Sequence, residues 1–348
     1  MRLIKVAVAM VAASVVLTSC GMSTPPGSAG TSLTGPATAV LADRSIQAVT
    51  DSPHQVLPAT VISHDLDGDR TVTVTDTSRI VALNISGSIA ATIWALGFGP
   101  SIVGRDIAAD FPQMQNVPVV TKDGHTINNE AVLKLDPTLV ITDGSIGPID
   151  VVNQLRDVGV TVVYVHDDPS FAGAEEMAHE VAAALGTPDT GDLLATQIHN
   201  QVAAARADVA KRAPQDPSKK LRMVFLYMRG NAGVYYLFGK GEGADDLIDA
   251  LGGVDVAAEL HWDSLVPLTD EAMVQADPDL ILVMTDGLAS VGGIDGLLSS
   301  HPAIALTNAG QHRRIVDMND GDILSYGPRS ASVLEALADA IYGPGGKS

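Results

Sequence analysis

Two residues at the end of a predicted strand could together form a metal-binding site, one as the ligand and the other as its charged neighbour. Tyr227 and Arg229 close the apolar run that starts at Leu221, and alternation along a strand puts both on one face. A guanidinium beside a phenol favours the phenolate, a hard anionic oxygen that suits ferric iron. Tyr227 is therefore a candidate ligand. It could also merely pack at the strand end, and Tyr235 and Tyr236 are alternatives.

His125 and Met284 stand at the ends of other predicted strands. His125 lies in the loop after the strand predicted at residues 117–120, and Met284 ends the run at residues 280–284. A loop histidine is often only solvated, but an imidazole is also a common metal ligand. The methionine sulfur could contact a flat aromatic ligand or fill the core. Because ligands of open α/β sheets bind beyond the carboxyl ends of the strands, we expect these side chains to share a cleft.

The other histidines are spread along the chain. His261 and His312 could approach the cleft. The rest are expected in the N-terminal segment, in a hairpin, or in helices and loops away from the cleft: His54, His64, His166, His179, His199 and His301.

A near-repeat describes the elements that must position these side chains. Residues 127–141 and 268–282 each read as a polar cap, a glutamate, a short apolar-periodic stretch, Asp-Pro and a β-branched run. This pattern predicts a short helix that leads into a buried strand. Two copies predict two lobes of similar design, and the cleft between such lobes is a natural place for a ligand.

Each copy of the repeat places one glutamate in the first turn of its helix, Glu130 in the first copy and Glu271 in the second. The helix dipole stabilises a carboxylate there, so the position alone explains these residues as well as a function does.

The pattern of the remaining chain predicts an α/β protein with two Rossmann-like lobes joined by a long helix, with the ligand cleft between them. The N-terminal lobe is expected at residues 79–171 and the C-terminal lobe at 213–344. Residues 172–212 are rich in helix-forming residues and are expected to be the connecting helix. Such a connection permits only a small hinge motion.

The N-terminus is typical of an exported protein. Basic residues precede an apolar run that is too short to span a bilayer, so residues 1–20 are predicted to be a signal peptide. The end of this segment resembles the lipobox of bacterial lipoproteins, and Cys20, the only cysteine, would be the lipidated residue. Residues 21–78 are predicted to be a flexible stalk that contains a hairpin at 65–76.

Composition excludes some functions. The formal net charge of −20 and the lack of a basic cluster argue against a nucleic-acid partner. The glycines at 239–243 lack the dinucleotide-binding spacing, and no Ser-His-Asp or zinc-site spacing is present. These spacings therefore indicate no particular enzyme class.

Three segments and the lipobox carry a family resemblance. The chain resembles the substrate-binding lipoproteins of ABC importers for iron complexes and cobalamin. More narrowly, it is similar to the hemin-binding lipoproteins of bacterial heme importers. The segments that carry the narrower similarity are residues 225–248, 284–298 and 325–329.

The resemblance implies a lipid-anchored protein on the extracytoplasmic face of the cell membrane, with heme as its transported ligand. Tyr227 and His125 would bind the heme iron, and Arg229 and Met284 would also contact the heme. Glu130 and Glu271 would dock against arginines of a permease dimer, one per lobe. A surface protein is a further candidate partner, as heme donor. The alternatives are a ferric siderophore or cobalamin as ligand, or a chelatase or heme-modifying enzyme of the same fold.

Overall fold

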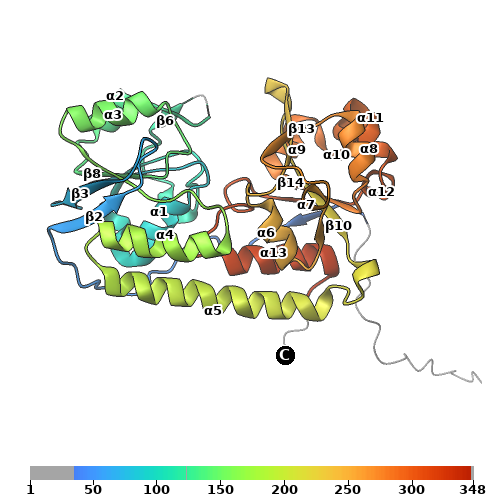
Figure 1. Cartoon of the computed structure of the whole chain (residues 1–348), viewed down its shortest axis with the longest axis horizontal. Coiled ribbons are helices and arrows are strands. Elements are labelled where there is room, and N and C mark those ends of the chain that lie inside the picture. The colour runs from blue at the N-terminus through green and yellow to red at the C-terminus, as the bar shows by residue number, and fades with distance from the viewer. Residues whose placement is uncertain (1–34, 123, 346–348) are drawn as a thin grey trace, which may run out of the picture.

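The protein has two α/β lobes that lie side by side above one long helix (Figure 1). The computed structural model describes residues 35–122 and 124–345. The long helix α5 (Pro188–Arg212) runs beneath both lobes and joins them. The predicted fold class is therefore confirmed. The predicted connecting segment is divided, because α4 (Phe171–Ala184) belongs to the N-terminal lobe and only α5 spans both lobes.

The N-terminal lobe is built on a four-stranded parallel sheet in the order β5-β4-β8-β9. β4 and β8 are buried at every position, as their continuous apolar runs require. α2 and α3 contribute to the apolar cluster on one face of the sheet, and α1 and α4 to that on the other. The elements of this lobe are β4 (Ile80–Leu83), α1 (Ser88–Ile93), β5 (Ile102–Arg105), α2 (Asn129–Lys134), β8 (Leu139–Thr142), α3 (Ile149–Asp157) and β9 (Thr161–Tyr164).

The C-terminal lobe contains a mixed sheet in the order β1-β15-β14-β10-β11-β13, and β12 also pairs with β10. β11 is antiparallel to both of its neighbours, whereas the other pairs are parallel. Its strands are β1 (Ala37–Ala39), β10 (Arg222–Arg229), β11 (Val234–Phe238), β12 (Val254–Asp255), β13 (Leu265–Pro267), β14 (Leu280–Met284) and β15 (Ile315–Met318). Its helices are α6 (Ala244–Ala250), α7 (Val256–Glu259), α8 (Asp270–Ala276), α9 (Thr285–Ser290), α10 (Gly293–Ser300), α11 (Pro302–Leu306), α12 (Asn308–Gln311) and α13 (Ser330–Tyr342).

Both copies of the near-repeat fold as predicted, as a capped helix followed by a buried strand. The side chain of Asn128 accepts a hydrogen bond from the Ala131 amide (3.2 Å) at the start of α2. Thr269 does the same for the Ala272 amide (3.1 Å) at the start of α8. The side chains at both caps satisfy backbone donors that would otherwise lack partners.

The N-terminal segment differs from the predicted flexible stalk. From residue 35 onward it is part of the fold, because β1 pairs in parallel with β15 at the edge of the C-terminal sheet. Leu41 and Ile46 are buried in the core behind it. Cys20 and the predicted signal peptide lie outside the described residues.

A hairpin with the predicted Asp-Gly turn is present on the N-terminal lobe, but its first strand precedes the predicted residues 65–76. β2 (Ala59–Ser63) and β3 (Arg70–Val74) pair in antiparallel register, and Asp65 accepts a backbone hydrogen bond from Gly68 (2.9 Å) in the turn. Ser63 and His64 join this hairpin to β9, since the Ser63 hydroxyl accepts from the Tyr164 amide (2.8 Å) and the His64 amide donates to the Tyr164 carbonyl (2.9 Å). None of the helices in the described part of the chain has the length and apolar character needed to cross a bilayer.

One apolar cluster continues through both lobes. It includes Val181 of α4, Ile198 of α5, Phe225 of β10 and Leu334 of α13. α5 packs against α4 on the N-terminal side and against α13 on the C-terminal side. The lobes therefore share a core at their base, and the surfaces free to form a cleft are at the ends away from α5.

Candidate ligand-binding cleft

A cavity of about 780 Å³ is lined by residues of both lobes. This volume lies in the range of cofactor and small-molecule sites. Its walls include the residues at or just beyond the carboxyl ends of β5, β8, β10 and β14, as expected for an open α/β sheet. The four residues predicted as ligand contacts, Tyr227, His125, Arg229 and Met284, all line this cavity.

The C-terminal wall includes residues of β10 and β11. Tyr227 lies opposite Tyr236 on the antiparallel neighbour, and both line the cavity. Tyr235 points to the other face of the sheet, where its ring packs against His301 with centroids 4.4 Å apart. Strand alternation thus removes Tyr235 as an alternative ligand and keeps Tyr236.

Arg229 is held beside Tyr227 by several contacts. Its guanidinium carbon lies 4.7 Å from the centre of the Tyr227 ring. Nη1 donates to the Met228 carbonyl (3.0 Å), and Nη2 pairs with Asp320 Oδ2 (2.8 Å). Nη2 also lies 3.7 Å from the sulfur of Met284. The positive charge is therefore fixed over the aromatic ring, in a cation–π arrangement.

The N-terminal wall carries His125. This residue lies in the turn of a short hairpin between β6 (Thr121–Lys122) and β7 (Thr126–Ile127). The strand predicted at residues 117–120 is reduced to a single bridge between Val119 and Arg105, because the chain leaves the sheet there to form this hairpin.

The imidazole of His125 is in a form that can bind a metal ion. Its Nδ1 is buried and has no hydrogen-bond partner among the described residues. Burial, and then the positive charge of Arg229 across the cleft, lower the pKa of the imidazole. The ring is therefore neutral near pH 7, with one nitrogen lone pair free for a metal. A buried nitrogen without a partner is costly, so a ligand that satisfies it would stabilise this arrangement.

Buried carboxylates occupy the strand ends of the N-terminal lobe. Asp143 follows β8 and lines the cavity, and Asp106 follows β5 beside it. Burial raises the pKa of each to about 6. The Asp106 carboxylate accepts from the Ala108 amide (2.6 Å), and that of Asp143 accepts from the Ser145 amide (2.9 Å). These bonds shape the loops that border the cleft.

Arg105 was not predicted as a site residue. It ends β5 and lines the cavity, and its side chain donates to the backbone carbonyls of Met114 and Asp106, both at 3.1 Å. It forms no ion pair with a carboxylate in the described residues. Its position at the carboxyl end of a strand, which Tyr227 shares, is a signal that could have identified it, because ligands of open α/β sheets bind beyond these strand ends.

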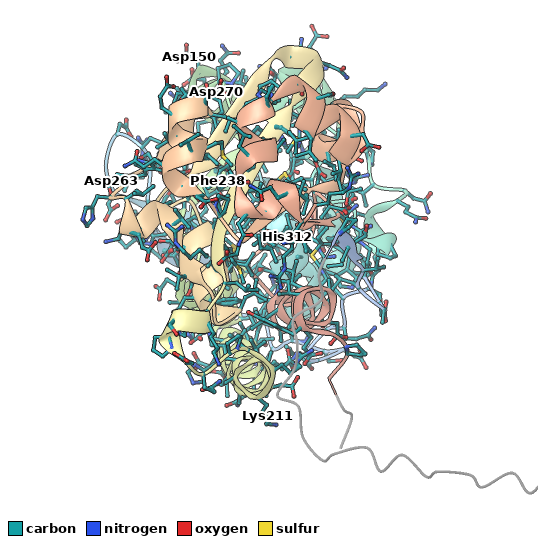
Figure 2. The ribbon with its side chains drawn as sticks, turned by 90° about the vertical axis from the view of Figure 1, so that its right-hand side faces the viewer. Asp150, Lys211, Phe238, Asp263, Asp270 and His312 are labelled. Carbon is teal, nitrogen blue, oxygen red and sulfur yellow. The ribbon has the colours of Figure 1, made fainter. Side chains whose placement is uncertain are left out.

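The two predicted docking glutamates lie outside the cavity. Glu130 of α2 and Glu271 of α8 are both exposed. Figure 1 places α2 and α8 on the sides of their lobes away from α5. The side view in Figure 2 agrees, with Asp270 of α8 and Asp150 of α3 at the top and Lys211 of α5 at the bottom. The helices that carry these two glutamates thus lie on one common side of the molecule.

Two further histidines do not reach the cleft. His261 is exposed in the segment after α7. His312 follows α12, with its Nδ1 next to the Asn308 carbonyl at 2.9 Å, and Figure 2 shows it on the outer end of the C-terminal lobe. Neither contributes to the cavity lining.

Solved structures of binding proteins closely match this chain. The heme binding protein HmuT has 39% sequence identity and a TM-score of 0.83, with 89% of this chain and 97% of that chain covered. Variants of HmuT in which an arginine, a histidine or a tyrosine is replaced by alanine match with the same TM-score of 0.83, at 38% identity. The periplasmic heme-binding protein RhuT from Roseiflexus sp. RS-1 in apo form has 36% identity and a TM-score of 0.69, with 77% of this chain and 98% of that chain covered.

A curated relative and a family model agree with these structures. The ABC transporter substrate-binding lipoprotein YvrC of Bacillus subtilis (strain 168), itself uncharacterized, is 27% identical over 293 residues, which cover 83% of this chain and 87% of YvrC. The periplasmic binding protein family model matches residues 80–320. The chain therefore belongs to the periplasmic binding protein family.

Proposed function

We propose that this protein captures hemin in the interlobe cleft and delivers it to the permease of an ABC importer. The observation that carries the proposal is the cleft itself, which is lined by Tyr227 and Arg229 of one lobe and by His125 of the other, whose buried Nδ1 has no hydrogen-bond partner among the described residues. A flat ligand held between the lobes would present its metal to side chains from both walls. A binding role, rather than catalysis, is in keeping with the family.

Tyr227 is the proposed principal iron ligand. A phenolate is a hard anionic donor that suits ferric iron, and the Arg229 guanidinium carbon lies 4.7 Å from the centre of the Tyr227 ring. The buried Nδ1 of His125 marks this imidazole as the candidate second ligand. The HmuT variants support the assignment, since the tyrosine and arginine replaced there stand two positions apart, as Tyr227 and Arg229 do.

The carboxylate groups of hemin need a cation in a cleft that is rich in aspartate. Arg229 is already paired with Asp320 at 2.8 Å. Arg105 lines the same cavity and is held only by backbone carbonyls, so its charge is available to a propionate. Met284 and Phe238 supply apolar surface for the ring.

A hemin titration of the purified, tag-free protein tests the function. We expect a Soret band with the high-spin or mixed ferric signature of a tyrosine-ligated heme, and saturation of binding. Cobalamin and a ferric siderophore serve as competitors. If either quenches tryptophan fluorescence while hemin does not, the heme proposal is wrong. Conversion of bound hemin to a new product would favour the alternative of a heme-modifying enzyme.

Matched tyrosine variants test the ligand. Tyr227→Phe keeps the ring and removes only the oxygen, so hemin affinity should fall by more than about 100-fold, beyond the loss typical of a residue that only supports a ligand. Tyr236→Phe is the control, because it changes the cross-strand neighbour in the same cavity. A loss in Tyr236→Phe alone would move the ligand to that position and leave heme binding in place.

Docking and anchoring complete the proposal. Glu130 and Glu271 are exposed, each belongs to one lobe, and neither forms an ion pair with a described residue. They are suited to meet arginines of a two-subunit permease, one on each lobe.

Cys20 is the proposed lipidation site that would hold the protein on the extracytoplasmic face of the membrane. A surface protein that hands over heme is a further proposed partner.

A further inference from the structure

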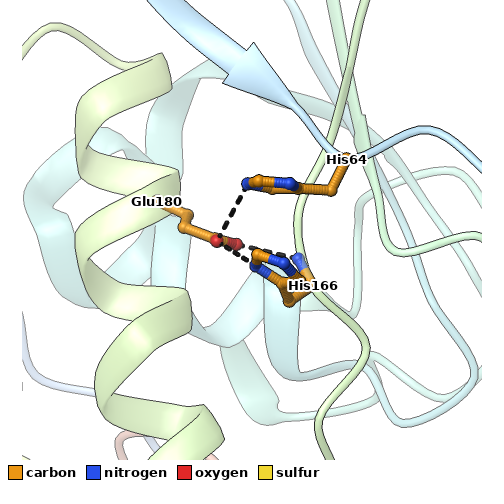
Figure 3. Close-up of side chains that lie close together, drawn as sticks. All are labelled: His64, His166 and Glu180. Atoms are coloured by element: carbon orange, nitrogen blue, oxygen red, sulfur yellow. Dashed lines mark hydrogen bonds and ion pairs between the residues drawn. The ribbon is translucent and has the colours of Figure 1, made fainter. Parts of the chain in front are cut away.

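Two histidines and a glutamate meet on the N-terminal lobe, outside the cleft. His64 comes from the end of the β2–β3 hairpin, His166 follows β9, and Glu180 lies on α4. Their possible ligand atoms all lie within 4.8 Å of one another. Figure 3 shows the two rings one above the other, with the carboxylate reaching toward both. None of the three residues lines the cleft.

The backbone holds the cluster in place. The His64 amide donates to the Tyr164 carbonyl (2.9 Å), which fixes the hairpin beside β9 and stacks the His64 and His166 rings with centroids 3.7 Å apart. The His166 amide donates to Glu180 Oε2 (2.8 Å). The other carboxylate oxygen, Oε1, is thereby directed toward both rings, and it contacts His166 Nδ1 and lies 3.4 Å from His64 Nε2.

His64 lies between two carboxylates. Its Nδ1 lies 3.0 Å from Asp69 Oδ1, and an ionised carboxylate only accepts hydrogen bonds, so Nδ1 carries the hydrogen. Its other ring nitrogen, Nε2, is directed at the second carboxylate and lies 3.4 Å from Glu180 Oε1. A histidine that ligates a metal typically has this arrangement, with its second ring nitrogen bonded to a carboxylate.

We propose that His64, His166 and Glu180 bind one divalent transition-metal cation of the Zn²⁺ class, with Asp69 orienting His64. Two imidazoles and one carboxylate are a ligand set that Zn²⁺ accepts, with a solvent molecule in the fourth position. The side chain of His166 is 55% exposed and that of Glu180 13%, so the cluster is open to solvent at His166. Ligand atoms around Zn²⁺ stand roughly 3.3 Å apart, close to the His64–Glu180 separation.

A bound cation would join three segments that are distant in sequence. It would connect the hairpin, the end of β9 and α4, and it would fix the start of the loop in which Asp167 and Asp168 line the cleft. The site would thus brace one wall of the cleft from behind, without contact with the cleft ligand.

Zn²⁺ titration calorimetry on the tag-free, hemin-free protein tests the proposal. We expect one Zn²⁺ per chain and a rise in melting temperature on adding Zn²⁺, because the cation binds only the folded arrangement. His64→Ala and Glu180→Gln should weaken Zn²⁺ binding by more than about 100-fold, and Asp69→Asn by about 10-fold. Circular dichroism of the metal-free variants establishes that they are folded.

Two variants serve as controls. His199→Ala removes an exposed histidine that faces only one carboxylate, Glu175 at 3.0 Å, and should keep full Zn²⁺ affinity. His125→Ala removes the histidine of the cleft and should also keep it. Equal Zn²⁺ binding by the wild type, His64→Ala and Glu180→Gln, or loss only in His125→Ala, would overturn the proposal, as would a wild-type protein that binds no Zn²⁺. Co²⁺ should produce visible d–d bands that disappear in Glu180→Gln.

Discussion

At the scale of single residues, the position relative to the strand end decides which side chains face the cleft. Tyr227, Met284 and Arg105 all stand at the carboxyl end of a strand and all line the cavity. Alternation then separates neighbours, so that Tyr236 faces the cavity and Tyr235 the core behind it. Burial lowers the pKa of the His125 imidazole, and its buried Nδ1 has no hydrogen-bond partner among the described residues.

Replacement of His125 should have a smaller effect than replacement of Tyr227. In a cleft that water can enter, an imidazole competes with water for its coordination position, so His125→Ala should weaken hemin binding by only about 10-fold and shift the visible spectrum toward a site with one protein ligand. Absorbance titration of the two variants measures both effects. Unchanged spectra in His125→Ala would leave Tyr227 as the only axial ligand, and a larger loss than in Tyr227→Phe would reverse their roles.

Asp143 makes stability depend on pH in a defined direction. Burial raises the pKa of its carboxyl from 3.8 to about 6, so the folded protein takes up a proton at a higher pH than the unfolded chain does. The protonated Asp143 carboxyl therefore makes its full contribution to folding stability below pH 3.8. This contribution is lost as the pH rises through about 6. Asp143→Asn removes the buried charge, so its melting temperature relative to the wild type should rise between pH 5 and pH 7.5, by the equivalent of about 1–3 kcal/mol.

The control for this effect is an exposed aspartate. Asp76 is exposed, and its hydrogen bonds to Ser78 lower the pKa of its carboxyl, the opposite direction from Asp143. Asp76→Asn should therefore not show the rise. A melting-temperature difference between Asp143→Asn and the wild type that stays constant with pH would mean that the buried carboxyl titrates in its ordinary range.

Sequence patterns could identify the cleft residues but not the second cluster. Tyr227 and Arg229 are near in sequence and on one strand, so alternation is sufficient to pair them. His64, His166 and Glu180 meet only because the His64 amide bonds to the Tyr164 carbonyl, a contact between segments far apart in the chain. No local periodicity encodes such a contact, so the sequence predicts only that both histidines lie away from the cleft.

At the scale of elements, strong periodicity and cap residues predicted the helices and strands of the near-repeat correctly. The short strand β1 could not be predicted from the sequence. The helix and strand in each copy of the near-repeat form as predicted because cap, apolar face and β-branched run agree. β1 has only three residues and lies in a segment rich in small and polar residues. Its strand conformation depends on pairing with β15, which the local sequence does not encode.

The paired glutamates at the starts of α2 and α8 lead to an element-scale prediction. Replacing Glu130 and Glu271 together by Ala should leave hemin binding unchanged, because both are exposed and outside the cavity. The same double variant should abolish heme-dependent growth or uptake in cells if the carboxylates dock on the permease. Each single variant should lose only part of the uptake, since the unchanged lobe keeps its contact.

The exposed acids beside them are the matched control. Asp150 and Asp270 lie at the first turns of α3 and α8 on the same side of the molecule, so Asp150→Ala with Asp270→Ala makes an equal change in charge. This pair should retain uptake. If both double variants lose uptake equally, general surface charge rather than specific docking is responsible. Loss of hemin binding in Glu130→Ala with Glu271→Ala would instead connect these residues to the cleft.

At the scale of the whole molecule, the lobes are coupled at their base and along the cleft floor. The core continues beneath both lobes through α5. Arg44 adds a polar bridge, since its Nη2 contacts Asp110 of the N-terminal lobe (2.5 Å) and its Nε contacts Asp322 of the C-terminal lobe (2.7 Å). Gly321 permits a close approach there, because an added Cβ would lie 2.8 Å from the Ala108 carbonyl oxygen. A wide opening of the two lobes would disrupt the shared core, the Arg44 bridge and the close approach at Gly321.

We therefore expect the distance between the lobes to change little when the ligand binds. Spin labels at Asp150→Cys and Asp270→Cys, both exposed and one on each lobe, report this distance by pulsed electron paramagnetic resonance once Cys20 has been replaced. The distribution should be single and narrow, and gallium protoporphyrin, which is diamagnetic, should shift it by less than about 2 Å. Arg44→Ala should broaden it, because Asp110 loses its link to the other lobe, whereas Lys211→Ala on the exposed side of α5 should not. Two well-separated distances in the ligand-free protein would show that the shared core does not restrain the lobes and that capture proceeds by hinge closure.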